Sequence, residues 1–193
     1  SYRLVGSEMC IRDSLQIVWP ELNVNVVSTT EQWAGAAIAG PKSRDMLSKL
    51  YPDLDVSNEA LPFMGYKEAE FFGVPSRIFR ISFSGELAYE INVKSDHGMF
   101  MWEKMMEVGK DFGNQPYGTE ALSTLRIEMG HVAGPELDGR TIPSDVSLNG
   151  LVSKKKDFIG KNSLGREAFN VESRQKIVGL IPIDRKSSIP EGS

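Results

Sequence analysis

Alternation of apolar and polar residues is the clearest pattern in the chain, and it is strongest in FRISFSGELAYEINV at 79–93. Such alternation places successive side chains on opposite faces of a β-strand. The segment predicts two antiparallel strands, 75–83 and 87–93, joined by a tight turn at 84–86. The apolar residues from Leu87 onward share one face of the second strand. Glu86 and Glu90 are predicted to lie together on its other face.

Other runs predict further strands and a fold class. Short apolar or alternating runs indicate strands at 22–28, 33–40, 66–73 and 174–183. Because the strands occur in antiparallel hairpins, with helices set between groups of strands, we expect an α+β fold rather than a doubly wound one. The prediction is an antiparallel sheet with packed helices.

Helical spacing, with a break or cap residue at the ends, predicts helices at 41–51, 95–108, 117–130 and 158–169. In the helix at 95–108 we assign the apolar stripe to Met99, Trp102 and Met106, with Met101 and Met105 beside them. Methionine in such a stripe is more often packing material than part of a cofactor site. In the helix at 117–130, Arg126 falls at the edge of the apolar stripe, where it either reaches water or pairs with an acid.

The bulk composition is that of an ordinary soluble protein. The chain has 193 residues, of which 40% are hydrophobic and 25% charged, enough for one domain or two small ones. A net charge of −4 disfavours a nucleic-acid partner. No apolar run approaches the roughly 18–20 residues of a membrane span, and no secretory signal is visible. We therefore expect a cytoplasmic protein without a nucleic-acid or membrane partner.

Few residues suit catalysis or metal binding. With one cysteine, Cys10, and two histidines, His97 and His131, we expect no internal disulfide and no metal site. Both histidines fall at helix ends, where capping or surface roles are commoner than catalysis. No Walker loop, Gly-x-Ser-x-Gly or Gly-x-Gly-x-x-Gly motif is present, so this chain codes no dinucleotide site.

One carboxylate has a candidate binding role. Glu90 on a rigid strand can accept two parallel hydrogen bonds from an amidine-like edge, such as that of a pterin or a guanine. A solvated strand face explains the same pattern and is the interpretation that the residues alone favour, although they leave both open.

The N-terminal segment has an unusual sequence. LVGSEMCIRD at 4–13 is similar to the translation of a transposon-type sequencing adapter. We therefore expect residues 1–14 to be a non-native tail, which would leave Cys10 without meaning. A plain N-terminal helix is the alternative.

Several longer motifs, taken in order, carry a family resemblance. They are AIAGPKSRDML, LPFM, RISFSGELAYEINV, YGTEALSTLRIEMGH, SKKKDFIGKNSLGRE and KIVGLIP. From about residue 15 to 193 the chain resembles the aminomethyltransferase family, which has the folate-binding T-protein fold. Within that family it is most similar to the C-terminal, folate-binding part of sarcosine oxidase alpha subunits.

The resemblance implies a function and a set of ligand residues. Tetrahydrofolate would trap the one-carbon unit released when an N-methyl amine is oxidised, giving 5,10-methylenetetrahydrofolate. The family's pterin-binding glutamate falls on Glu90, and a tyrosine beside the pterin in glycine-cleavage members is Phe83 here. A family arginine falls on Leu122, which leaves Arg126 as the nearest cation for the folate. FAD and NAD are expected only in other parts of the chain or in other subunits.

The resemblance also implies that the chain is a fragment, truncated at both ends. It assigns 15–170 to the folate-binding domain and 171–193 to the start of a C-terminal β-barrel. The family's catalytic aspartate would lie upstream, so no catalytic residue is expected here and the isolated fragment should be inactive. Its partners would be the missing parts of the same chain and the other subunits of a hetero-oligomer.

Three alternatives remain at this stage. Two lie within the family: a stand-alone aminomethyltransferase and a dimethylglycine dehydrogenase. The third is a non-enzymatic folate-binding or structural module. Iron–sulfur-assembly and tRNA-modification relatives carry a Lys-Gly-Cys motif, whereas this chain reads DFIGKN at 157–162.

Overall fold

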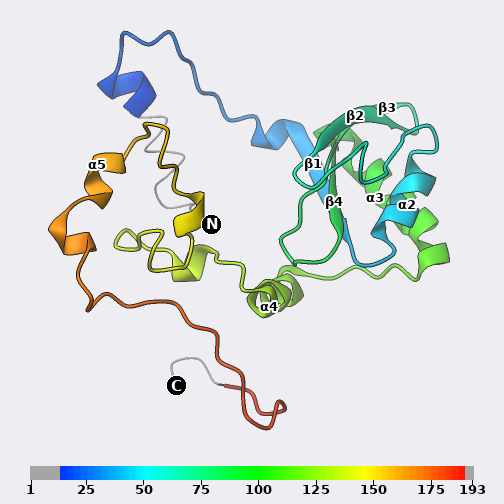
Figure 1. Ribbon diagram of the computed structural model, residues 1–193. Helices are drawn as coiled ribbons and strands as arrows, with labels where there is room; N and C mark the ends of the chain where they lie inside the picture. The colour runs from blue at the N-terminus through cyan, green and yellow to red at the C-terminus, as the bar shows by residue number, and fades with distance from the viewer. Residues whose placement is uncertain (1–13, 190–193) are drawn as a thin grey trace. The chain divides into compact units, whose positions relative to one another are not determined.

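The computed structural model describes residues 14–189, which form two compact units, 14–131 and 132–189 (Figure 1). Apart from Ser14, the predicted non-native tail lies outside the described residues. The predicted domain boundary near residue 170 is untested and stays a prediction.

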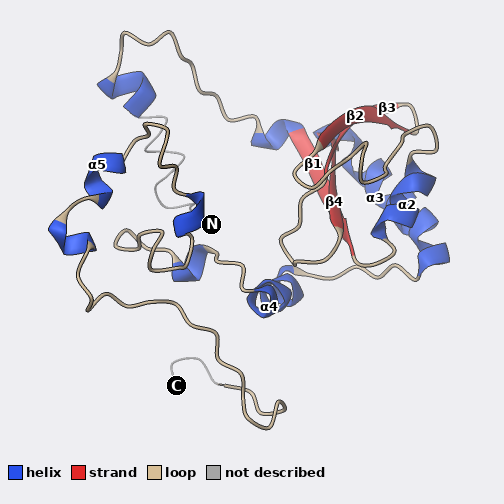
Figure 2. Ribbon diagram, viewed as in Figure 1, coloured by secondary structure: helices blue, strands red, loops and turns tan. Residues whose placement is uncertain are grey.

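The unit 14–131 is built on a four-stranded antiparallel sheet with the strand order β1-β4-β3-β2 (Figure 2). The strands are β1 (Trp33–Ala39), β2 (Tyr66–Phe71), β3 (Val74–Phe79) and β4 (Ala88–Lys94). Because β4 pairs with β1 on one edge and with β3 on the other, it is a central strand. The predicted α+β class with an antiparallel sheet is confirmed.

Three α-helices accompany the sheet: α2 (Ser43–Leu50), α3 (Gly98–Gly109) and α4 (Thr119–Met129). The helical predictions for these segments are confirmed. Shorter turns are η1 (Ser14–Val18), η2 (Thr30–Gln32), η3 (Ser95–His97) and η4 (Lys110–Phe112). Across residues 14–189, no helix combines the length and the apolar character that crossing a membrane requires.

The core of this unit lies between one face of the sheet and the helices α2 and α3. The alternation in β4 works as predicted, because Tyr89, Ile91 and Val93 are fully buried. Other sheet and helix residues complete the same cluster: Ile38, Phe71, Ile78, Met46, Leu47, Leu50, Met101 and Met105. Burial of a side chain of this size contributes about 1.5–3 kcal/mol. This cluster therefore fixes the position of β4.

The apolar stripe of α3 is rotated from the predicted one. Met101 and Met105 are 2% and 3% exposed, whereas Met99 and Trp102 are 70% and 44% exposed. The assignment of Met99 and Trp102 to the packed stripe was wrong. Apolar residues occupy more than half of the circumference of this helix, so the sequence period did not decide which part of that wide stripe meets the sheet.

The connection between β3 and β4 is longer than the predicted tight turn. The ladder between these strands ends at the pair Phe79–Glu90. Beyond it, the N–H and C=O groups of Arg80 bond to the 64–65 segment, and the C=O of Leu87 accepts bonds from the N–H of Gly40 and the hydroxyl of Ser43. Residues 80–87 are therefore a loop, and Glu86 lies in it, exposed, rather than on the strand beside Glu90.

The unit 132–189 contains little regular structure. Its elements are η5 (Gly134–Glu136), η6 (Asn149–Leu151), α5 (Lys161–Leu164) and η7 (Glu167–Phe169). The predicted strands at 22–28 and 174–183 are not strands, because neither finds a pairing partner among the described residues. The predicted helix at 158–169 is reduced to α5 and η7. That 171–193 begin a β-barrel stays a prediction.

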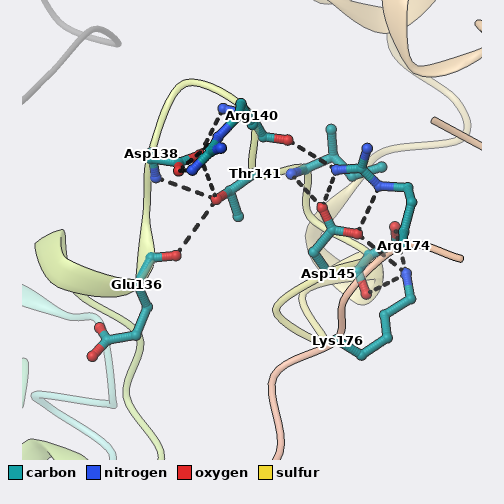
Figure 3. A network of polar contacts seen from close by, with 9 residues as sticks. Glu136, Asp138, Arg140, Thr141, Asp145, Arg174 and Lys176 are labelled. Carbon is teal, nitrogen blue, oxygen red and sulfur yellow. Dashed lines mark hydrogen bonds and ion pairs between the residues drawn. The ribbon is translucent and has the colours of Figure 1, made fainter. Parts of the chain in front are cut away.

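An ion pair of the buried carboxylate of Asp145 ties distant parts of this second unit together (Figure 3). The carboxylate of Asp145, 8% exposed, accepts hydrogen bonds from the guanidinium of Arg174 and from the N–H of Ile142 at 3.0 Å. Lys176 approaches the same carboxylate at 3.3 Å, and the N–H of Ile177 donates to the C=O of Asp145 at 2.7 Å. Residues 174–177 are thereby tied to the loop that contains Asp145.

We predict that Met101→Ala lowers the free energy of unfolding of the protein by about 2–5 kcal/mol, because it leaves a cavity between α3 and the sheet. Met99→Ala is the matched control on the same helix, and we expect it to change stability by less than about 0.5 kcal/mol. Urea unfolding followed by tryptophan fluorescence measures both. Equal losses for the two variants would contradict the packing described here.

The ion pair of Asp145 makes the second unit sensitive to acid. The Arg174 guanidinium, together with the Ile142 N–H, holds the pKa of Asp145 well below its usual range. An unfolded aspartate titrates near a pKa of about 3.9, so this stabilisation is fully present above that pH and is lost as the pH falls toward the folded-state pKa. Hydrogen-exchange protection of the Ile142 and Ile177 amides, corrected for intrinsic rates, should fall with acid over this range.

Asp145→Asn should remove that pH dependence. The control is Asp157→Asn, because the side chain of Asp157 is fully exposed in its pair with Lys161, and exposed pairs contribute little. If the Asp145 variant keeps the wild-type profile, another group controls the acid sensitivity.

Candidate functional site

The face of the sheet opposite the core is open within the described residues of unit 14–131, and Glu90 lies on it. Its register partners are Ala37 on β1 and Phe79 on β3, and Phe79 pairs in turn with Tyr66 on β2. The rings of Phe79 and Tyr66 lie 5.0 Å apart and tilted. Glu90 therefore has a small side chain on one side and an aromatic pair on the other.

Glu90 is half-buried, and its carboxylate makes no hydrogen bond or ion pair with any residue in 14–189. A carboxylate that loses water without gaining a donor costs free energy. Partners for such a group are hydrogen-bond donors from outside the described chain, including those of a ligand. The alternation in the sequence predicted this placement, and the structure adds that the carboxylate has no internal partner.

The next row of residues across the same face contains an ion pair. It consists of Gly35, Asn92, Arg77 and Glu68. The guanidinium of Arg77 lies over the ring of Trp33 at 4.0 Å and 3.6 Å from the carboxylate of Glu68. Because Arg77 is engaged in this way, its charge is already matched by Glu68, and Glu90 has no adjacent counter-charge.

Small residues leave room beside Glu90. A β-carbon on Gly35 would lie 2.8 Å from the Oδ1 atom of Asn92, so the amide of Asn92 occupies the space that a side chain at position 35 would take. Ala37 lies next to Glu90 on the same strand face as Gly35. On β1, therefore, only the methyl group of Ala37 lies directly beside Glu90 on this face.

A groove of about 580 Å³ follows β1 and includes Ala37 in its lining. Its other walls come from α3 and from the 112–119 segment, with Trp102, Phe112 and Tyr117 as the aromatic members. Small-molecule sites in proteins usually have volumes of about 300–1,000 Å³ and mainly apolar walls. The groove therefore lies along the β1 edge of the sheet, and Glu90 is not among the residues that line it.

The other two predicted ligand residues lie elsewhere in this unit. Phe83, 38% exposed, is in the 80–87 loop, and its ring contacts that of His131 at 4.8 Å. Arg126 on α4 is only 6% exposed and donates to the C=O of His131 at 3.2 Å. His131 thus joins Phe83 to Arg126. None of the hydrogen bonds, ion pairs or ring contacts within residues 14–189 joins Glu90 to either of them.

His131 is the residue that sequence reasoning missed. It was expected to be a capping or surface residue, and its backbone does end α4. Its ring contact with Phe83 spans 48 positions of the sequence, 131 minus 83, so no local pattern indicates it. The glycine that precedes it is the one available signal, because it marks the helix end that places His131.

Together, these features define an α+β domain whose open sheet face carries a partly buried, partnerless carboxylate. The sequence matches the GCVT N-terminal domain over residues 2–156, and the chain belongs to that family.

Curated relatives of the chain are enzymes. The sarcosine oxidase subunit alpha of Rhizobium meliloti (strain 1021) is 46% identical over 181 residues, which cover 92% of this chain and 18% of that protein. An aminomethyltransferase of Chloroherpeton thalassium is 32% identical over 83% of this chain and 44% of its own length. The mitochondrial dimethylglycine dehydrogenase of Mus musculus is 29% identical over 89% of this chain and 20% of its own length.

The chain therefore spans about a fifth of the sarcosine oxidase subunit that it matches. The predicted family is confirmed. The roles of Glu90, Phe83 and Arg126 in binding a ligand stay predictions.

Proposed function

We propose that this chain is the tetrahydrofolate-binding part of a sarcosine-oxidase-like alpha subunit, with Glu90 as the residue that recognises the pterin. The observation that carries the proposal is the half-buried carboxylate of Glu90, which has no partner within the described chain. The 46% identity to a sarcosine oxidase subunit supports the same assignment.

The chemistry of a pterin suits this position. Its 2-amino group and N3–H present two parallel donors, which one carboxylate can accept together. A central strand paired on both edges holds the carboxylate more rigidly than a loop would. Arg77, a cation on this face, is engaged with Glu68 and Trp33 and forms no ion pair with Glu90.

In the proposed reaction the protein chiefly binds tetrahydrofolate, orients it and shelters the reacting atoms. Bound tetrahydrofolate supplies the nucleophilic nitrogen that takes up the one-carbon unit, giving 5,10-methylenetetrahydrofolate. Glu90 and Phe83 would fix the ring, which provides proximity and orientation. Arg126, bonded to the C=O of His131, would act on the site through His131.

The oxidation of the N-methyl amine needs a flavin, and the sequence contains no dinucleotide-binding motif. We place FAD and NAD in other parts of the protein or in other subunits of a hetero-oligomer. We place the whole assembly in the cytoplasm, the compartment that the sequence predicts. The catalytic aspartate of the family would likewise come from outside this chain.

We expect Glu90→Gln in the full-length protein to raise the Kd for tetrahydrofolate about 10- to 150-fold. The substitution keeps the shape of the side chain but replaces charge-assisted hydrogen bonds worth about 1.5–3 kcal/mol. Isothermal titration calorimetry of the wild type and the variant measures the difference.

Glu70→Gln is the matched control, because Glu70 is an exposed acid on β2 of the same sheet. The Kd of the Glu70→Gln variant for tetrahydrofolate should stay within twofold of the wild-type value. Equal affinities for wild type and Glu90→Gln would remove Glu90 from the site, and a wild type that binds no reduced folate would end the proposal.

A further inference from the structure

We infer that His131 is a positioning residue that holds the ring of Phe83 in place at the end of α4. The expected effect of His131 on ligand binding rests on the proposed function. The contact between the two rings does not depend on it. The inference concerns only contacts inside the unit 14–131.

The end of α4 fixes the backbone of His131. Gly130 adopts a left-handed conformation with φ of +76°, and its N–H donates to the C=O of Ile127 at 2.9 Å. The N–H of His131 donates to the C=O of Arg126 at 2.8 Å. These two bonds form a Schellman motif, the usual way in which a helix ends at a glycine.

Arg126 adds a second bond to the same residue. Its Nη1 atom donates to the C=O of His131 at 3.2 Å, and Arg126 itself is buried. Both backbone polar groups of His131 are thus bonded to one residue of α4. The base of the His131 side chain is therefore held at a fixed position relative to the helix.

The 80–87 loop packs on this helix end at two points. The ring of Phe83 meets the His131 ring edge to face, with centroids 4.8 Å apart and planes at 62°. Gly85 has φ of +86°, and a β-carbon there would lie 2.4 Å from the Cγ atom of Met129. The loop backbone therefore approaches α4 as closely as a glycine permits.

The position of the Phe83 ring depends on His131, because few other contacts hold the ring among the described residues. The ring is 38% exposed, and His131 is its only aromatic neighbour among the described residues. An edge-to-face pair is the favoured geometry for two such rings. Without the imidazole, we expect the Phe83 ring and its loop to sample other positions, and a ligand would then have to order them on binding.

The structural part is tested by hydrogen exchange on the full-length protein without folate. In His131→Ala, exchange of peptides that cover residues 82–86 should be about two- to tenfold faster than in the wild type. His131→Phe keeps an aromatic edge and should restore wild-type exchange. Unchanged exchange in His131→Ala overturns the inference.

The functional part is tested by a double-mutant cycle read out by calorimetry with tetrahydrofolate. His131→Ala should raise the Kd about two- to tenfold, and His131→Phe should not. In a Phe83→Leu background, His131→Ala should have no further effect, because its action passes through the Phe83 ring. An equal effect in both backgrounds would mean that His131 contacts the ligand itself, and it would overturn the positioning role.

The two proposals fail separately. If the wild type binds no tetrahydrofolate while exchange responds to His131 as expected, the ring contact stands and the proposed function falls. If Glu90→Gln weakens binding while neither His131 variant changes exchange or Kd, the proposed function stands and the present inference falls.

Discussion

The pairing of β4 on both of its edges is the constraint on which the rest of the 14–131 unit depends. Hydrogen bonds to β1 and β3 fix the register of this strand, and the period of two then decides which side chains meet the core. A slip by one residue would turn Tyr89, Ile91 and Val93 outward and bring Glu90 into the core. The apolar cluster with α2 and α3 makes that slip costly, so packing on one face determines what the other face presents.

The two compact units are stabilised by different means. In 14–131 an apolar core between sheet and helices dominates. In 132–189 the regular elements are short, and the ion pair of Asp145 with Arg174 ties distant parts of the chain together. An ion pair of a buried carboxylate adds little net stability. Breaking it is costly, however, because an uncompensated charge is left behind. The ion pair therefore favours one arrangement of the loops over others, but it adds little to the free energy of unfolding.

Sequence reasoning succeeded where a local pattern and the tertiary structure agree. The strands β1 to β4 and the helices α2 and α4 follow from period and end signals, and the faces of β4 follow from its alternation. It failed where only distant contacts decide. The backbone of Arg80 bonds to the 64–65 segment, and this ends the β3–β4 ladder early. In α3 the apolar stripe is so wide that two different sides of the helix could have faced the sheet.

The candidate site divides in the same way. Glu90 was predictable because it depends on strand alternation, and its family position came from the resemblance. The contact of His131 with Phe83 could not be predicted, because it joins a helix end to a loop that is far away in the sequence. The segments at 22–28 and 174–183 alternate convincingly but find no neighbouring strand in residues 14–189, and alternation alone does not make a strand.

The stacking of Arg77 on Trp33 has a spectroscopic consequence. This indole lies on the open face, two residues along β1 from Gly35, with a cation against its ring. Its emission should therefore be sensitive to any change in that charge contact. With the other two tryptophans of the chain replaced, the fluorescence of Trp33 would report on the sheet face that carries Glu90.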